Sequence, residues 1–154
     1  MRMSFSLWLE KGWLKEYKPT SREIAELLAV ADRSLKDCQV AGLSNEGKLD
    51  MAHNAALQSS AAALAAAGYR ASREAYHYYV IQSLSFTLQL EERIIRRLNK
   101  LRLKRNISDY ERPGIVTEQE AQEMVELAKQ IRQQVEAWIR NNHPELGKEL
   151  NASA

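Results

Sequence analysis

The last third of the chain carries the most regular helix pattern in the sequence, and this pattern restricts the fold to helical architectures. Apolar side chains recur at steps of three and four residues from Ala121 to Trp138, as they do along one face of an α-helix. Just before them, Thr117 is followed three residues later by Glu120, a spacing typical of a helix N-cap. We therefore expect a long helix over about residues 117–140.

Two more helices are predicted nearer the N-terminus. Pro19 and the capping box Thr20–Glu23 open the first, which Gly42 ends. Ser44 caps the second, and Gly68 is its C-terminal stop. The second helix has small side chains at many positions, so another backbone can approach it closely: Ala52, Ala55, Ala56, Ala62, Ala63 and Leu64.

A further helical region follows a predicted turn at 69–72. Apolar spacing continues from Ala75 to Leu84 and resumes over about Glu91–Tyr110, and the sequence leaves open whether this region is one helix or two. Strand signals are nearly absent. The fold class we predict is all-α, an antiparallel four-helix up-down bundle with a short N-terminal helical extension.

Three segments follow from this pattern: an amphipathic extension over 1–18, the bundle over 19–142 and a flexible tail over 143–154. Trp8 and Trp13 in the extension are expected to pack on the bundle or, alternatively, on a partner. Glu10 and Gly12 interrupt the apolar run, so it fits neither a signal peptide nor a membrane span. We predict a cytoplasmic protein that does not enter a membrane.

Composition supports one domain with a core of its own. A chain of 154 residues is long enough to bury such a core without disulfides. Cys38 is the only cysteine, which favours an intracellular location, and it shares a helical stripe with Ala31 and Leu35 that makes it a core thiol.

The formal net charge of +2 is too small to imply nucleic-acid binding by itself. The cations are nevertheless concentrated on one predicted helix, where they can contact phosphates or form a solvated face balanced by acids such as Glu91 and Glu92. They are Arg93, Arg96, Arg97, Lys100, Arg102, Lys104 and Arg105.

A polar cluster occupies the end of the same helix. Ile94, Leu98 and Leu101 follow one helical stripe, and the next residue on it is Arg105 instead of a hydrophobe. Asp109 lies one turn beyond Arg105, so the two can pair, and Asn106 and Tyr110 have the same spacing. Such a cluster indicates either a site or a network that ties down the end of the helix.

No metal or cofactor site is predicted. The three histidines, His53, His77 and His143, are far apart in the sequence and lack nearby carboxylates at metal-ligand spacing. No glycine-rich phosphate loop is present. His77 stands among three tyrosines and is the histidine we consider a supporting site residue.

The chain resembles the HEPN superfamily of helical bundles over about residues 21–140. The strongest part of the resemblance is the R-N-x-x-D-Y stretch, followed by a threonine-capped last helix. The supporting segments are Asn54–Ala56, Ala66–Arg70, Tyr76–Tyr78 and Leu101–Asn106.

The resemblance implies a homodimer that brings together the arginine motifs of both subunits. Active HEPN proteins are metal-independent ribonucleases that use an arginine, the polar residue after it and a histidine four to six residues beyond the arginine. Arg105 and Asn106 match the first two, but Tyr110 stands where the histidine is expected. In the register of related toxins, Ser108 occupies the histidine position and Tyr110 is the tyrosine that a nucleotidyltransferase antitoxin modifies.

Two functions follow as expectations. The first is a toxin or defence effector that binds or cleaves RNA, with Arg105 stabilising phosphate charge, Asn106 orienting substrate, and Tyr110 or Asp109 in proton transfer. A tyrosine is a poor base near neutral pH, so it would need cations such as Arg102 or Arg105. The second is a catalytically silent HEPN module that binds nucleotide or RNA, or regulates a nucleotidyltransferase partner.

Overall fold

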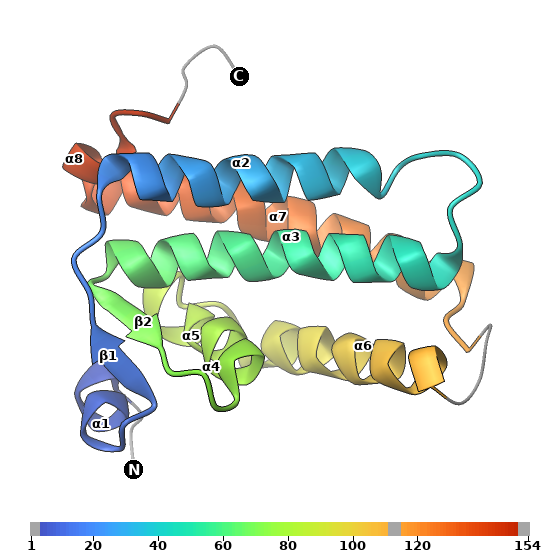
Figure 1. Cartoon of the computed structure of the whole chain (residues 1–154), viewed down its shortest axis with the longest axis horizontal. Helices are drawn as coiled ribbons and strands as arrows, with labels where there is room; N and C mark the ends of the chain where they lie inside the picture. The colour runs from blue at the N-terminus through green and yellow to red at the C-terminus, as the bar shows by residue number, and fades with distance from the viewer. Residues whose placement is uncertain (1–3, 111–114, 151–154) are drawn as a thin grey trace.

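The computed structural model describes the backbone of residues 4–110 and 115–150, and the side chains of 4–104 and 115–150. Three long helices lie side by side: α2 (Ser21–Asp37), α3 (Asn45–Ala66) and α7 (Glu118–Asn142). A fourth, α6 (Glu92–Tyr110), lies along the other side of α3 (Figure 1). The described chain is mainly helical, which confirms the all-α fold class.

Helix α3 is central because its side chains are small. It packs against α2, α7, α6, α4 and α5. Its buried positions are mostly alanines, among them Ala52, Ala56 and Ala63, which are fully buried. Ser59 and Ser60 are also buried, and their hydroxyls donate to the carbonyl oxygens of Ala55 and Ala56 at 2.8 and 2.7 Å, so their burial leaves no hydroxyl unsatisfied.

The predicted helix starts are confirmed. The Thr20 hydroxyl accepts from the backbone N–H of Glu23 at 3.1 Å, and Thr117 does the same with Glu120. In both boxes the glutamate carboxylate accepts in return from the threonine N–H. Local sequence alone therefore sets where α2 and α7 begin.

The N-terminal extension differs from the helical segment we predicted. Helix α1 (Phe5–Glu10) is followed by strand β1 (Leu14–Glu16), which pairs antiparallel with β2 (Tyr69–Ala71), where the sequence indicated a turn. Three-residue strands are too short to show an alternating pattern, and their partners lie more than fifty residues apart in the chain.

The extension packs on the bundle. Trp8 is fully buried, and its ring meets those of Trp13, Tyr79 and Phe86 at centroid distances of 6.3, 5.1 and 4.9 Å. This edge-to-face cluster holds α1 and the loop after it against α4 and α5. Trp8 therefore packs on the bundle and is not displayed toward a partner.

The region that the sequence left open consists of separate helices. Helix α4 (Tyr76–Gln82) is followed by α5 (Leu84–Thr87), and then by α6. Gln89, between α5 and α6, has a φ of 53°, and Ala75, just before α4, has a φ of 55°. A left-handed residue cannot continue a right-handed helix, so the chain changes direction at both positions.

The segment that we expected to be a flexible tail, residues 143–154, contains a helix that the sequence did not indicate. Helix α8 (Pro144–Gly147) forms directly after α7, and Leu150 is buried. Two long-range bonds hold the segment: Arg140 donates to the Leu150 carbonyl at 3.1 Å, and Ser21 donates to Glu149 at 2.5 Å. A polar sequence is ordered here by contacts with the ends of α2 and α7.

Two further expectations concern the described residues. Cys38 is fully buried and its thiol contacts the Leu35 carbonyl oxygen at 3.1 Å, which confirms a core cysteine. Among residues 4–110 and 115–150, no helix is both long and apolar enough to cross a membrane.

Candidate functional site

The strongest candidate surface is a row of cations on α6, which we call the α6 stripe: Arg93, Arg96, Arg97, Lys100 and Lys104. Steps of three and four residues place all five on one side of the helix. On the other side, Ile95, Leu98 and Leu101 are buried in the core. Packing of these apolar residues against the bundle therefore fixes the direction in which the cations point.

Two cations of the stripe are held by α7. Arg97 donates two hydrogen bonds of 2.6 Å to the two carboxylate oxygens of Glu123, in the forked geometry that guanidinium groups favour. Lys104 Nζ lies 2.6 Å from Glu120 Oε2. These two pairs tie the exposed face of α6 to the start of α7.

The charges of these pairs perturb one another. The hydrogen bonds from Arg97 lower the pKa of Glu123 and raise the pKa of Arg97 itself. Burial on its own would raise the pKa of Glu120, but hydrogen bonds from Lys104 and Thr117 outweigh burial and lower it. Both glutamates are therefore ionised at neutral pH and remain acceptors for the α6 cations.

The other three cations of the stripe are available to a ligand. Arg96 and Lys100 are exposed and have no carboxylate within 4.0 Å among the described residues. Arg93 has one long contact, 3.7 Å to the exposed Glu91. All three line a groove of about 310 Å³ between α6 and α7. Its other lining residues are the Arg97–Glu123 pair, Ile94 and Leu127.

Most of the site predicted from the motif falls outside the described side chains. Arg105, Asn106, Ser108, Asp109 and Tyr110 belong to α6, whose backbone is helical to Tyr110, but their side chains are not among those described. Their roles stay predictions. The stripe and the motif nevertheless share one continuous helix, with the stripe on the N-terminal side.

The two supporting residues are described. Arg102 is half-buried, and its Nε is buried without a hydrogen-bond partner among the described residues. His77 is exposed on α4, and its ring lies 6.3 Å from the ring of the buried His53 on α3. The sequence separates these histidines by 24 positions and offered no signal that they would be neighbours.

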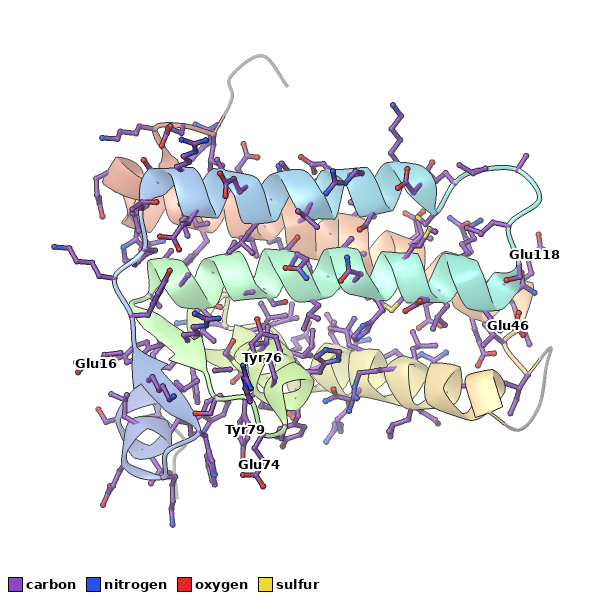
Figure 2. All side chains as sticks on the ribbon, viewed as in Figure 1. Glu16, Glu46, Glu74, Tyr76, Tyr79 and Glu118 are labelled. Carbon is purple, nitrogen blue, oxygen red and sulfur yellow. The ribbon has the colours of Figure 1, made fainter. Side chains whose placement is uncertain are left out.

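A second concavity, missed by sequence reasoning, lies at the end of the bundle next to β2. We call it the tyrosine pocket because Tyr17, Tyr69 and Tyr76 line it together with Glu23 and Arg70. Figure 2 shows Tyr76 on α4, below α3. Glu23 was interpreted from the sequence as a helix cap, and only the fold shows that its carboxylate also borders a pocket.

Comparisons with known proteins provide no assignment: no protein-family model, no curated protein and no solved structure matches this chain. Within the described part of the chain, no group of three or more histidine, cysteine, aspartate or glutamate side chains could hold a metal ion. The site therefore has to be interpreted from its own geometry.

Proposed function

We propose that this protein is an RNA-binding helical bundle of HEPN type, in which α6 is the nucleic-acid helix. The observation that carries the proposal is the exposed part of the α6 stripe, Arg93, Arg96 and Lys100, which has an excess of positive charge and a groove beside it. The four-helix up-down topology and the cytoplasmic homodimer implied by the HEPN resemblance are parts of the same proposal.

The stripe has the properties that a phosphate backbone requires. Arg93 and Lys100 are seven residues apart, which is roughly 10 Å along the helix axis, so several successive phosphates lie within reach. Three cations that each neutralise one phosphate of a single strand give a slope of log affinity against log salt of about −2. Such contacts hold the strand without distinguishing its bases.

The chemistry beyond binding depends on the end of α6. In the ribonuclease form of the proposal, Arg105 stabilises charge at the phosphorus, Asn106 orients the RNA, and Tyr110 or Asp109 moves the proton of the ribose 2′-hydroxyl, with support from Arg102, Ser108 and His77. No metal or cofactor enters this mechanism. The enzyme would be a metal-independent endoribonuclease of a toxin-antitoxin or defence system.

A specific observation favours a second form without catalysis. The motif histidine is absent, and an ordinary tyrosine with a pKa of about 10 is a weak base at neutral pH. In this form the module binds RNA or nucleotide, or regulates a nucleotidyltransferase partner that modifies Tyr110. RNA cleavage in the first form and RNA binding in the second both require the α6 stripe to bind a polyanion.

Binding is tested with a labelled single-stranded RNA followed by fluorescence anisotropy over a range of salt concentrations. The double variant Arg96→Gln/Lys100→Gln should bind about ten-fold more weakly, and its salt slope should fall by about 1.4. The matched control is Arg33→Gln/Lys36→Gln, which removes two exposed cations from α2. Equal weakening by both double variants would mean that net charge, not the stripe, determines binding.

Cleavage is tested separately, with chelator present and with Arg105→Ala as the control, after circular dichroism has shown that the variant keeps its helices. Loss of cleavage in this variant supports the ribonuclease form. If the parent protein binds RNA through the stripe but does not cut it, the non-catalytic form holds. Cleavage that persists in Arg105→Ala contradicts the proposed role of Arg105.

A further inference from the structure

The tyrosine pocket is a built cavity away from the α6 stripe. It measures about 390 Å³, at the lower end of the range of roughly 300–1,000 Å³ that small-molecule sites occupy. It lies where α2, the C-terminal half of α3, β2 and α4 meet, whereas α6 runs toward the opposite end of the bundle (Figure 1). A ligand in this pocket would therefore bind at a place separate from the α6 stripe.

The walls of the pocket are mostly apolar. Leu27 and Val30 come from α2, Leu64 and Ala65 from α3, and Val80 from α4. Leu64 and Val80 are almost fully buried, so they form the floor. A ligand that fills this space has an apolar body, because no polar group on the floor is available to pair with it.

The polar groups at the rim differ in what they can still bind. Tyr17 donates its hydroxyl hydrogen to one carboxylate oxygen of Glu23, and the other oxygen accepts from the N–H of Thr20 at 3.3 Å. The bond from Tyr17 lowers the pKa of Glu23, so this carboxylate stays ionised and gives no donor to a ligand. Glu26 is paired with Arg22 at 3.1 Å.

Arg70 is the rim group with hydrogen-bond donors left for a ligand, although its charge, after the bonds from Tyr17 and Thr20, also helps to lower the pKa of Glu23. Its guanidinium lies 5.8 Å from the centroid of the Tyr17 ring, in a cation–π contact that orients it beside the pocket. It has no carboxylate within 4.0 Å among the described residues. The backbone N–H of Tyr17 donates to the carbonyl oxygen of Gly68 at 2.9 Å. The Tyr17 ring that Arg70 contacts is therefore anchored at the edge of the sheet.

From this arrangement we propose that the tyrosine pocket binds a small monocarboxylate with an apolar body, its carboxylate paired with Arg70 and its body between α2, α3 and α4. A planar carboxylate matches the two-pronged guanidinium. A doubly charged phosphate fits less well, because Glu23 and Glu26 place two negative charges at the same rim. The proposal does not depend on the RNA-binding function.

The head group is tested by isothermal titration calorimetry with octanoate, and with octan-1-ol and octylamine as chains of the same length. Octanoate should bind the parent protein about ten-fold more tightly than either control, and Arg70→Gln should remove this preference. Arg73→Gln, which changes an exposed arginine outside the pocket, should leave octanoate binding unchanged. Equal affinity for octanoate and octan-1-ol, or no loss in Arg70→Gln, would overturn the proposal.

The location is tested by filling the pocket. Ala61 lines it from α3 and is half-buried, so Ala61→Phe should occupy the cavity and abolish octanoate binding while circular dichroism shows an unchanged helix content. If this variant does not fold, octanoate-induced shifts of the tyrosine ring resonances in the parent protein take its place. Octanoate binding that leaves those resonances unmoved, or no binding by the parent at millimolar octanoate, contradicts the proposal. RNA affinity of Arg70→Gln should equal that of the parent.

Discussion

Helix α7 forms ion pairs on two sides, and the two sides differ in how their charges balance. Toward α2, Arg132 donates to Asp32 at 2.8 and 3.0 Å and to Glu136 of its own helix at 2.8 Å, and Glu136 also accepts from Arg140 at 3.0 Å, so two cations meet two acids. Toward α6, the stripe has five cations, but α7 provides only two acidic partners for them among the described residues. Glu123 pairs with Arg97, and Glu120 pairs with Lys104. The first seam is a closed network, and the second has positive charge left over.

This difference separates structural cations from cations that can bind a ligand. The Arg132 side chain is only 13% exposed, and its N–H groups donate to carboxylates within the fold. Burial on its own would lower the pKa of Arg132, but the hydrogen bonds that it donates to the carboxylates of Asp32 and Glu136 outweigh burial and raise it. Arg96 and Lys100 are exposed and keep their full capacity for an anion. The cations on a helix therefore indicate a binding surface only once the acidic partners on the neighbouring helices are known.

Removing Arg132 should have the largest effect on stability. Arg132→Ala leaves Asp32 without an ion-pair partner among the described residues and leaves Glu136 with Arg140 alone. We expect the free energy of unfolding to fall by about 2 kcal/mol, less than for a fully buried pair because Asp32 is half exposed. Urea denaturation measures it. A loss as small as that of Arg33→Ala, an exposed arginine on α2, would show that the α2 seam is not a structural network.

Acid should weaken both seams. The folded-state pKa values of Glu120, Glu123 and Glu136 lie below the ordinary value of 4.5, so their stabilisation is complete above that pH and disappears as the pH falls through the lower folded values. Urea midpoints measured from about pH 6 down to about pH 3 should fall, and Glu136→Gln should fall less steeply. Glu126→Gln, on the exposed side of α7, is the control. An unchanged slope in Glu136→Gln would contradict this reasoning.

Removing the free cations should have the smallest effect on stability. Arg96→Gln/Lys100→Gln breaks no ion pair among the described residues, so its free energy of unfolding should stay within about 0.5 kcal/mol of the parent. The same variant is expected to lose RNA affinity. A large stability loss would mean that these cations belong to the fold, and the contrast between the two seams would then disappear.

Much of the helical architecture was predictable because its determinants are local. The capping boxes at Thr20 and Thr117 act within three residues, and the apolar stripe that contains Ala31, Leu35 and Cys38 is buried as expected. The strand pair and the ordered residues 144–150 were not predictable, because both form through contacts with distant segments.

The candidate sites were predictable to different degrees. The concentration of cations on one helix was visible in the sequence, but their division into paired and free members was not. The R-N-x-x-D-Y motif remains a sequence prediction, because its side chains lie outside the described residues. The tyrosine pocket had no sequence signal, since Tyr17, Glu23 and Arg70 come from separate elements.

The sequence by itself determined where α2, α3 and α7 begin, which face of α2 and of α7 is apolar, and that α6 carries seven of the 22 lysines and arginines, since these properties depend on neighbours within one or two turns. Tertiary structure alone decided which charges are neutralised by partners on other helices. Arg132 finds Asp32 across 100 positions, and Arg97 finds Glu123 across 26. A charge pair requires two groups a few ångströms apart, and for residues on different helices only the packing of those helices brings them to that distance.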